Sequence, residues 1–414
     1  MTLKKNIIIA GAGFGGITAA LRLAKNIGPY NKDYEIILID KHHHHLYTPA
    51  LYEIAAIPKE FTPEALLKSS ILIPISDIVQ ERPIKFICDE IAGLKASDNR
   101  LILKNSAEME YKFLVLALGS ETNYFDIPGL KENSFPLKTY TDAAKLRDII
   151  ENLVREKENI KIVVGGGGAS GVELVAEFVN FICTLQGEIS ESRKSCAVEF
   201  VLLEADPEIL GGFEPWALNK ARKRLIQLGI TIKTDSIIDS VAPGIITLKN
   251  GETESYNIFI WTGGVKGPEI FKNFGLPLSN KGALVIDEYL QIKNTGGRIF
   301  AIGDNSTFTN PRTGKPLLWN VPVAEAEGRL AAKNILLALR GLTLQKFSPL
   351  KKYPYILAVG GGYAIANLLF IRFSGFGGLV TKALVELRYL IFILPLRKAL
   401  ATWFRAVKYY SAND

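Results

Sequence analysis

The stretch Ile7 to Gly16, with the sequence IIIAGAGFGG, decides the fold of this chain. Its apolar half is typical of a buried strand and runs directly into a G-x-G-x-x-G turn, after which Ile17 to Asn26 has a helical pattern. A second apolar run, Glu35 to Asp40, ends on an acidic residue. Glycines at this spacing allow a tight turn and let the backbone approach a pyrophosphate at the N-terminus of the helix. The stretch therefore predicts a βαβ unit that binds a dinucleotide.

The same arrangement returns 155 residues later. Lys161 to Gly165 leads into Gly166 to Gly171 (GGGASG), a helix follows, and Val198 to Glu204 again ends on an acid. One glycine pattern is weak evidence, because such turns also serve only to pack a helix on a strand, but two copies in matching context are specific. Strands that alternate with helices along most of the chain predict parallel sheets. We therefore predict an α/β fold with two Rossmann-like dinucleotide-binding domains.

The acid at the end of the second strand has a predicted role in each unit. A carboxylate there accepts hydrogen bonds from an adenosine ribose and repels a 2′-phosphate. Glu204 therefore predicts a preference for NADH over NADPH, and no arginine stands among the next four residues to reverse it. The alternative is that Glu204 simply faces solvent.

Charge and cysteine content narrow the class of protein. The net charge is +7, yet nine basic and two acidic residues lie from Lys351 onward, so that residues 1–350 are neutral. The three cysteines, Cys88, Cys183 and Cys196, show no C-x-x-C or C-x-x-x-x-C spacing, which argues against a disulfide scaffold, a zinc ribbon or a redox-active dithiol. We expect them to be ordinary thiols. The N-terminus leaves no room for a signal peptide before the first strand, so we expect a cytosolic body.

Several local sequences resemble the type II NADH dehydrogenases, the non-proton-pumping NADH:quinone oxidoreductases of the FAD-dependent pyridine nucleotide oxidoreductase superfamily. They are Arg298 to Asp304, which ends in Gly-Asp, His44 to Tyr52 (HHLYTPALY) and Trp261 to Val265 (WTGGV). The resemblance runs along nearly the whole chain. It implies an FAD-binding domain with an NAD-binding domain inserted, followed by a membrane-associating helical segment. The implied division is 1–120 for the first part of the FAD domain, 121–160 for a connecting segment, 161–264 for the NAD domain, 265–345 for the second part of the FAD domain and 346–414 for the C-terminal membrane-anchoring or interface segment.

The resemblance also implies the cofactor-binding residues. Those expected at FAD are Gly11, Gly13, Phe14, Gly15, Gly16, Asp40, Lys41, His45, Ala117, Gly119, Gly303 and Asp304. Those expected at NADH are Gly166, Gly168, Gly171, Glu204 and Gly264. We expect His44 to shape the flavin loop with His45, and His42 and His43 to lie at the surface. Four adjacent histidines cannot converge on one ion in regular geometry, so no metal site is predicted.

Glu173 is the predicted catalytic residue. It lies in the first turn of the second nucleotide-binding helix, where the helix dipole favours a carboxylate. The resemblance implies that it faces the nicotinamide and the flavin and helps with hydride or proton handling. The alternative is an ordinary acid at a helix N-terminus.

The acceptor side departs from the family pattern. The family usually carries glutamines in a helical run that here reads NVPVAEAEG, Asn320 to Gly328, and Thr48 stands where a glutamine often precedes the proline. The resemblance implies a quinone site at Thr48, Pro49, Pro322, Val323 and Ala326, but the missing glutamines leave the acceptor open. One plain reading of Glu325 and Glu327 is that both are solvated.

The last segment predicts contact with a membrane surface. Gly360 to Gly362 lies in the middle of an uncharged run and favours a strand pair or a tight turn over a spanning helix. In Leu396 to Tyr410, helical spacing puts the apolar and basic side chains on separate arcs, which is typical of an interfacial helix. The alternative is a terminal helix docked on the protein core or on a partner in a homodimer. The apolar arc is Leu396, Leu400, Trp403, Phe404, Val407 and Tyr410, and the basic arc is Arg397, Lys398, Arg405 and Lys408.

These expectations combine into one predicted function. An FAD-dependent enzyme on the cytoplasmic face of the cell membrane takes hydride from NADH and passes two electrons to a quinone without pumping protons. Because no dithiol spacing is present, the flavin is the only predicted two-electron store. One alternative is an NADH-dependent flavoprotein reductase with a non-quinone acceptor. Another is an NAD-responsive flavoprotein that acts through membrane or protein association. The basic residues form no separate patch, so no nucleic acid partner is predicted.

Overall fold

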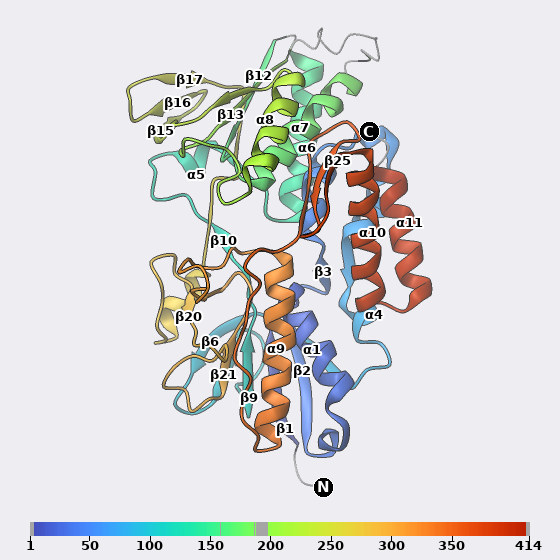
Figure 1. Cartoon of the computed structure of the whole chain (residues 1–414), viewed down its shortest axis with the longest axis vertical. Coiled ribbons are helices and arrows are strands. Elements are labelled where there is room, and N and C mark those ends of the chain that lie inside the picture. Colours follow the sequence, from blue (N-terminus) through green and yellow to red (C-terminus); the bar gives the residue numbers. More distant parts are fainter. Residues whose placement is uncertain (1–3, 158, 186, 188–197, 411–414) are drawn as a thin grey trace.

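The computed structural model describes residues 4–157, 159–185, 187 and 198–410, and it contains two parallel sheets with a pair of helices along one side (Figure 1). The first sheet has the strand order β21-β9-β1-β2-β5, and every pairing in it is parallel. Strand β21 comes from far along the chain, so this sheet is built from two separate parts of the sequence. Its strands are β1 (Lys5–Ala10), β2 (Tyr34–Asp40), β5 (Ile84–Cys88), β9 (Phe113–Leu116) and β21 (Ile299–Ala301).

The second sheet repeats this plan with the order β11-β18-β12-β13-β14, again entirely parallel. Its edge strand β11 comes from the segment before the second glycine motif. The predicted α/β fold with two parallel sheets is confirmed. The strands are β11 (Phe135–Pro136), β12 (Ile160–Gly165), β13 (Val198–Leu203), β14 (Thr231–Lys233) and β18 (Ile258–Trp261), and the helices beside them are α5 (Leu130–Asn133), α6 (Tyr140–Glu156), α7 (Ala169–Leu185) and α8 (Pro215–Gln227).

Helices α1 (Phe14–Asn26) and α9 (Val321–Leu339) lie against each other on the first sheet (Figure 1). They approach closely where Gly328 meets Gly15, because a Cβ on Gly328 would lie 2.4 Å from the carbonyl oxygen of Gly15. Helix α1 begins at Phe14 rather than Ile17, since the glycine turn itself supplies the first helical turn. Helix α9 begins at Val321, and the side chain of its cap Asn320 accepts a hydrogen bond from the Val323 N–H.

The remaining elements are short helices and small sheets outside the two large parallel sheets. The remaining helices and turns of helix are η1 (Gly28–Lys32), η2 (Thr48–Ala50), α2 (Leu51–Ala55), η3 (Lys59–Phe61), α3 (Glu64–Ile71), α4 (Ile75–Val79) and η4 (Glu269–Asn273). The small sheets pair β3 (His44–Leu46) with β4 (Leu72–Pro74), β10 (Glu121–Thr122) with β19 (Val265–Lys266), and β20 (Leu284–Val285) with β22 (Ser306–Thr307). Two three-stranded sheets are β6 (Ile91–Lys95), β7 (Arg100–Leu103) and β8 (Met109–Glu110), and β15 (Ile238–Ala242), β16 (Ile245–Leu248) and β17 (Thr253–Ser255).

The glycine run near the C-terminus forms a turn between two strands, as predicted. Strands β23 (Tyr355–Ala358), β24 (Ala364–Asn367) and β25 (Arg372–Gly375) form an antiparallel sheet. The turn packs on helix α7 beside the second sheet, because a Cβ on Gly360 would be 2.5 Å from the carbonyl oxygen of Ala176. The Arg224 guanidinium on α8 donates to the carbonyl oxygens of Val359 and Gly360 at 3.3 and 3.0 Å.

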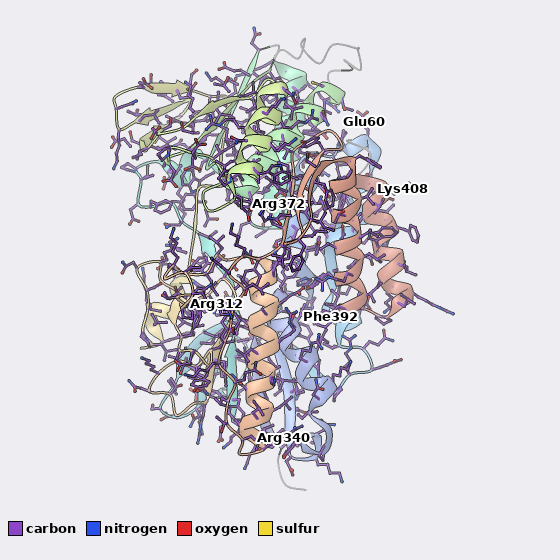
Figure 2. All side chains as sticks on the ribbon, viewed as in Figure 1. Glu60, Arg312, Arg340, Arg372, Phe392 and Lys408 are labelled. Carbon is purple, nitrogen blue, oxygen red and sulfur yellow. The ribbon has the colours of Figure 1, made fainter. Side chains whose placement is uncertain are left out.

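Two C-terminal helices, α10 (Phe376–Ile393) and α11 (Leu396–Tyr410), pack against α1 and α3 and contribute to the main hydrophobic core. Phe392 on α10 lies over α1, where the Arg22 guanidinium is 5.3 Å from its ring centroid (Figure 2). The basic, aromatic tail is therefore an integral part of the body rather than an appended module. Among the described residues, no helix is both long enough and apolar enough to cross a membrane.

Helix α11 has three faces where the sequence suggested two. The face that packs inward carries Ala399, Thr402, Ala406, Tyr409 and Tyr410 and lies between the two predicted arcs. The prediction that Tyr410 belongs to the outward apolar face is therefore wrong. The basic arc is also partly docked, because Lys398 pairs with Asp77 and Arg405 donates to the Ser69 hydroxyl. Leu396 and Phe404, 59% and 62% exposed, do point outward as predicted.

Candidate active site

The first glycine loop has the geometry of a cradle for a pyrophosphate. Gly11 has φ +108°, and a Cβ there would lie 2.2 Å from the carbonyl oxygen of Ala117. A Cβ on Gly16 would lie 1.9 Å from the carbonyl oxygen of Gly11, which explains the last glycine of the motif. A Cβ on Gly13 would meet no atom of the described residues within 4 Å. The loop is therefore closed behind and open at the middle glycine, which is where a phosphate approaches in this motif.

Asp40 at the end of β2 holds the middle of this loop. One of its carboxylate oxygens accepts a 2.7 Å hydrogen bond from the Ala12 N–H, and the other accepts a 2.8 Å bond from the His42 N–H. Lys41 beside it is exposed, and its carbonyl oxygen accepts a 3.6 Å contact from the Cys88 thiol. The acid predicted to bind a ribose thus also shapes the glycine turn.

His45 is buried beside the same loop, while His42 and His43 are exposed as predicted. Its Nδ1 lies 2.9 Å from the Ala12 carbonyl oxygen, and its Nε2 lies 2.9 Å from the Tyr389 hydroxyl on α10. Burial lowers the pKa of His45 to about 4, so the ring is neutral at ordinary pH. The sequence placed His45 at this site but missed Tyr389, because no pattern in α10 marks which of its residues points inward.

A group of buried and half-buried polar residues surrounds Asp304, which lies three residues beyond the end of β21. The Ser120 hydroxyl is 3.5 Å from Asp304 Oδ2 and accepts a 2.8 Å hydrogen bond from Lys138 Nζ. Burial raises the pKa of Asp304, and nearby Lys138 partly offsets this rise. Glu327 on α9 accepts a 2.6 Å bond from the Gly303 N–H, and burial raises its pKa to about 8. Lys138 and Glu327 are site residues that the glycine motifs could not indicate.

Asn305 connects this group to the end of β9. Its side-chain amide donates to the Leu116 carbonyl oxygen at 3.1 Å. Its side-chain oxygen accepts a 3.3 Å bond from the Gly119 N–H. Gly119 has φ +75°, a conformation that favours glycine. The predicted residues Ala117, Gly119, Gly303 and Asp304 are therefore brought together at the C-terminal edge of the first sheet.

The second glycine loop closely reproduces the first. Gly166 has φ +104°, and a Cβ on Gly171 would lie 2.0 Å from the Gly166 carbonyl oxygen. A Cβ on Gly168 would meet nothing within 4 Å in the described part of the chain. Glu204 accepts a 2.6 Å hydrogen bond from the Gly167 N–H and a 2.9 Å bond from the Asp206 N–H. The solvent-facing alternative for Glu204 is therefore wrong.

Gly264 comes one residue after Gly263, which packs against Gly166 at the back of the second loop. A Cβ on Gly166 would lie 2.5 Å from the Gly263 Cα, so Gly263 has the place that Ala117 has in the first loop. Gly264 instead packs on the Phe125 ring, where an added Cβ would lie 2.8 Å from the nearest ring carbon. The spacing of the motif alone could not distinguish these two adjacent glycines.

Glu173 on α7 lies half-buried against the C-terminal sheet. One of its carboxylate oxygens accepts a 3.3 Å hydrogen bond from the Ala358 N–H at the end of β23. Burial raises the pKa of Glu173 to about 8, with a further rise from Glu177 and a partial offset from the Ala358 N–H. At neutral pH the group is therefore mostly a neutral acid that can both donate and accept a hydrogen bond.

The predicted acceptor side meets α10. Glu325 on α9 is buried at 4% exposure, and its carboxylate pairs with Arg329 at 3.1 Å and with Arg388 of α10 at 3.6 Å. Glu327 is 2% exposed, so the reading of both glutamates as solvated is wrong. The Tyr47 ring, next to Thr48, lies 5.8 Å from the Tyr389 ring.

The five predicted acceptor residues lie near these contacts and differ in exposure. Thr48 is exposed, Pro49, Pro322 and Ala326 are half-buried, and Val323 is buried. They come from η2 and the first turns of α9, which meet α10 through the glutamate and tyrosine contacts described above. The sequence did not indicate that α10 lies beside these residues.

A second buried charge cluster lies between α2 and α10. Glu53 is 6% exposed, accepts a 3.1 Å hydrogen bond from the Tyr52 hydroxyl and pairs with Lys382. Lys382 also lies 4.8 Å from the Tyr52 ring centroid. Burial raises the pKa of Glu386 to about 7, and Lys382 opposes this rise. The sequence showed only the i,i+4 spacing of Lys382 and Glu386 and not their burial.

The described cysteines do not form a dithiol at either glycine loop. Cys88 is free and exposed at the end of β5, and Cys183 at the far end of α7 is in a disulfide, which corrects the expectation of three ordinary thiols. Cys196 lies outside the described residues. No cluster of metal-ligating side chains occurs in the part of the chain that the structure describes.

Comparison with known proteins agrees with this geometry. The family model of the pyridine nucleotide-disulphide oxidoreductases matches residues 5–328. The chain belongs to this family. It is 28% identical to demethylphylloquinone reductase NdbB of Synechocystis over 93% of this chain and 92% of that protein. It is 27% identical to the type II NADH:quinone oxidoreductase of Staphylococcus aureus over 83% of this chain and 85% of that protein.

A solved structure extends the likeness over the tail. The NDH2 of Plasmodium falciparum, solved with NADH, superposes with a TM-score of 0.82 and covers 98% of both chains at 17% identity. At that identity the match establishes the fold alone. Because it includes the C-terminal sheet and the helix pair α10 and α11, these elements belong to the fold. The predicted family, fold class and oxidoreductase class are therefore confirmed.

Proposed function

We propose that this member of the family is an FAD-dependent enzyme that oxidises NADH and reduces a membrane quinone without pumping protons. The observation that carries the proposal is the pair of matching glycine loops, each closed by its own carboxylate, without a dithiol among the described residues beside them. Two relatives whose lengths match this chain are named as quinone reductases, which supports the choice of acceptor.

The residues at the first loop fit FAD. The open side at Gly13, the carboxylate of Asp40 and the buried carboxyl group of Asp304 match a pyrophosphate, an adenosine ribose and a ribityl chain. Gly11, Gly16, Ala117 and Gly119 would shape the backbone around them. When bound, FAD supplies an acceptor for hydride and a store for two electrons. Phe14, Gly15, Lys41, His45 and Gly303 complete the proposed site.

The second loop fits NADH. Its open side lies at Gly168, and Glu204 keeps a carboxylate at the end of β13. That charge disfavours a 2′-phosphate, so NADH should be preferred to NADPH. Gly166 and Gly171 shape the backbone there, and Gly264 follows Gly263, which closes the loop. Glu173, as a mostly neutral acid at neutral pH, is proposed to contact the nicotinamide and to hold its carboxyl proton in place during hydride transfer.

The acceptor is proposed to enter beside Thr48, Pro49, Pro322, Val323 and Ala326. Buried, paired Glu325 occupies the helix where the family usually has glutamines, so hydrogen bonding to the acceptor must differ from the usual pattern. The names of the two relatives, a demethylphylloquinone reductase and a quinone oxidoreductase, favour a quinone over a soluble redox protein.

The outer face of the helix pair is proposed to bind the cytoplasmic surface of the cell membrane as a peripheral anchor. Four residues of α10, Phe376, Val380, Leu384 and Ile391, are 72%, 43%, 54% and 44% exposed, and Leu396 and Phe404 of α11 are exposed beside them. Exposed Arg388, Arg397 and Lys408 supply positive charge on the same helices. Apolar area bordered by basic side chains suits an anionic bilayer. A homodimer is the alternative occupant of this face.

Two kinetic measurements test the enzyme proposal. Anaerobic NADH should bleach the flavin of the purified protein. Steady-state NADH oxidation should proceed with ubiquinone or menaquinone as well as with ferricyanide. Turnover with ferricyanide but with neither quinone would overturn the quinone assignment, and a flavin that NADH does not bleach would overturn the enzyme assignment.

A further inference from the structure

A hydrogen-bonded chain of side chains connects the C-terminal helix α10 to the first glycine loop. The ring of His45, 1% exposed, lies between the carbonyl oxygen of Ala12 and the hydroxyl of Tyr389, at 2.9 Å from each. The Phe14 ring packs on both partners, with centroid distances of 4.9 Å to His45 and 4.8 Å to Tyr389. These three rings form one buried unit beside the glycine turn.

The chemistry of the atoms sets the direction of both hydrogen bonds. The Ala12 carbonyl can only accept, so Nδ1 of His45 carries the hydrogen. In a neutral imidazole the other nitrogen then accepts, and the Tyr389 hydroxyl must donate to Nε2. Burial keeps the ring neutral by lowering the pKa of His45 to about 4. The chain therefore runs in one sense, from Tyr389 through His45 to Ala12.

The second glycine loop holds the equivalent carbonyl in a different way. Gly167 stands where Ala12 stands, and its carbonyl oxygen accepts a 2.7 Å hydrogen bond from the Leu210 N–H in the loop that follows β13. That contact is made within the second domain by backbone. In the first loop, by contrast, His45 contacts the carbonyl oxygen, and His45 is itself held by Tyr389. Tyr389 is 344 residues away from His45 in the sequence.

We propose that His45 and Tyr389 are positioning residues for FAD, and that α10 is needed to retain the cofactor because it holds the peptide group of Ala12. The proposal rests on the assignment of FAD to the first loop. Asp40 accepts from the Ala12 N–H and His45 contacts the Ala12 carbonyl oxygen, so the two successive peptide groups on either side of the Ala12 Cα are both held. A loop that is already fixed loses less conformational freedom when its ligand binds, so the affinity is higher. Freeing it should act mainly on the rate of release.

The test uses holoenzyme carrying Tyr389→Phe, which removes one hydroxyl and keeps the ring packed on Phe14. FAD release is followed by flavin fluorescence after dilution. Loss of one buried hydrogen bond should speed release about threefold to tenfold. The variant His45→Asn keeps an amide donor for the Ala12 carbonyl but cannot reach Tyr389. In that background Tyr389→Phe should have no further effect, because the chain is already broken.

A matched control separates loop positioning from general loosening of the tail. Tyr410 on α11 is also buried, and its hydroxyl is 3.3 Å from the Ser70 hydroxyl rather than near the glycine loop. Tyr410→Phe should lower the melting temperature about as much as Tyr389→Phe and leave FAD release unchanged. Equal acceleration by both variants, or release at the wild-type rate from Tyr389→Phe, overturns the proposal.

The second site provides an internal reference. The dissociation constant of NAD⁺ should be the same in wild type and Tyr389→Phe, because Gly167 is held by Leu210. A protein that purifies without FAD and cannot bind it would overturn the proposed function. A protein that holds FAD but whose release rate is insensitive to both His45→Asn and Tyr389→Phe would overturn only the role given to α10.

Discussion

The two glycine loops use the same carboxylate contacts but are held from different directions. In each, an acid at the end of the second strand accepts hydrogen bonds from the middle of the loop and from the residue two positions after itself. In each, the first glycine has a positive φ, +108° in one loop and +104° in the other, and its carbonyl oxygen blocks any side chain on the last glycine. The carbonyl oxygen at the middle of the loop is held differently, by His45 in the first loop and by the Leu210 N–H in the second.

This difference matches what each loop is proposed to bind. In the second loop, where NADH is proposed to bind and leave at every turnover, the middle carbonyl accepts from a nearby backbone N–H, that of Leu210. In the first loop, where FAD is proposed to stay bound, the loop is also held by Tyr389 of α10 through His45. That contact must break before the loop can change conformation, which should slow release of the cofactor. The C-terminal segment thus has an inner face that contacts the first glycine loop and an exposed outer face, for which we proposed membrane binding.

The largest effect is expected from substitutions that disrupt each of the two glycine loops separately. Gly16→Ala would place a Cβ 1.9 Å from the Gly11 carbonyl, and Gly171→Ala would place one 2.0 Å from the Gly166 carbonyl. Gly16→Ala should yield protein without flavin. Gly171→Ala should stay yellow, while anaerobic NADH bleaches it at least about 100-fold more slowly in stopped-flow measurements because the nicotinamide is misplaced.

Gly377→Ala is the control for these two substitutions. Gly377 is an exposed helical residue of α10, where a Cβ would come no closer than 3.7 Å to the Phe373 ring. It should retain flavin and bleach at the wild-type rate. If Gly171→Ala lost its flavin as readily as Gly16→Ala, the two loops would not be independent and the comparison would fail.

Much of this fold could be predicted because its signals are local. The strand, the glycine turn and the acid at the next strand end all depend on residues close in sequence, so IIIAGAGFGG and Asp40 already specify the first unit. The antiparallel turn at Gly360 to Gly362 was predictable for the same reason. Periodicity also indicated the outward placement of Leu396 and Phe404.

The misses concern contacts between segments far apart in the chain. Glu325 looks like a solvated helical acid until Arg388 of α10 is placed beside it. Tyr410 has an apolar neighbour pattern, yet α3 covers a third face of its helix that no two-arc projection reveals. Tyr389 carries no local signal at all, because its importance comes from His45.

The second prediction separates the outer face of the tail from the inner one. Leu384→Ser combined with Phe404→Ser removes two side chains that are 54% and 62% exposed on α10 and α11. Binding to anionic vesicles in a sedimentation assay should weaken by roughly tenfold to 100-fold, given the apolar area lost. FAD release should not change, since the contacts of Tyr389 are intact.

Ile226→Ser is the control for this pair, because Ile226 on α8 is 59% exposed and far from the tail in sequence. It should bind vesicles as the wild type does. If the double variant bound vesicles normally and turned a dimer into a monomer in light scattering, the outer face would be a dimer interface instead.

The third prediction sharpens the role of the acid in the second loop. Glu204→Gln keeps an oxygen that can accept from the Gly167 N–H but removes the negative charge. The ratio of kcat/KM for NADPH to that for NADH should rise about tenfold, because repulsion of the 2′-phosphate is lost. Asp206→Asn, two residues on and exposed, should leave the ratio within about twofold of the wild-type value. An unchanged ratio in Glu204→Gln would mean that the nucleotide ribose lies elsewhere.

The smallest expected effect concerns a likeness between the two halves, since each contains a buried or half-buried acid whose pKa is raised to about 8. These are Glu327 beside the flavin loop and Glu173 on α7. In the unfolded chain a glutamate titrates near 4.5, so between that value and about 8 the folded protein holds a proton that the unfolded chain has released. Stability from each protonated acid is present at low pH and is lost as the pH rises toward 8.

The melting temperature of the holoenzyme should therefore fall between pH 6 and pH 8. Glu327→Gln and Glu173→Gln should each reduce that fall, by an amount equivalent to about 2 kcal/mol, because a glutamine keeps the hydrogen bond and cannot ionise. Glu269→Gln is the control, since two lysines lower the pKa of Glu269 to about 2 and it stays ionised across this window. If only one of the two substitutions changed the fall in melting temperature between pH 6 and pH 8, only that glutamate would have a raised pKa. The two halves would then differ in this acid as well as in how their loops are held.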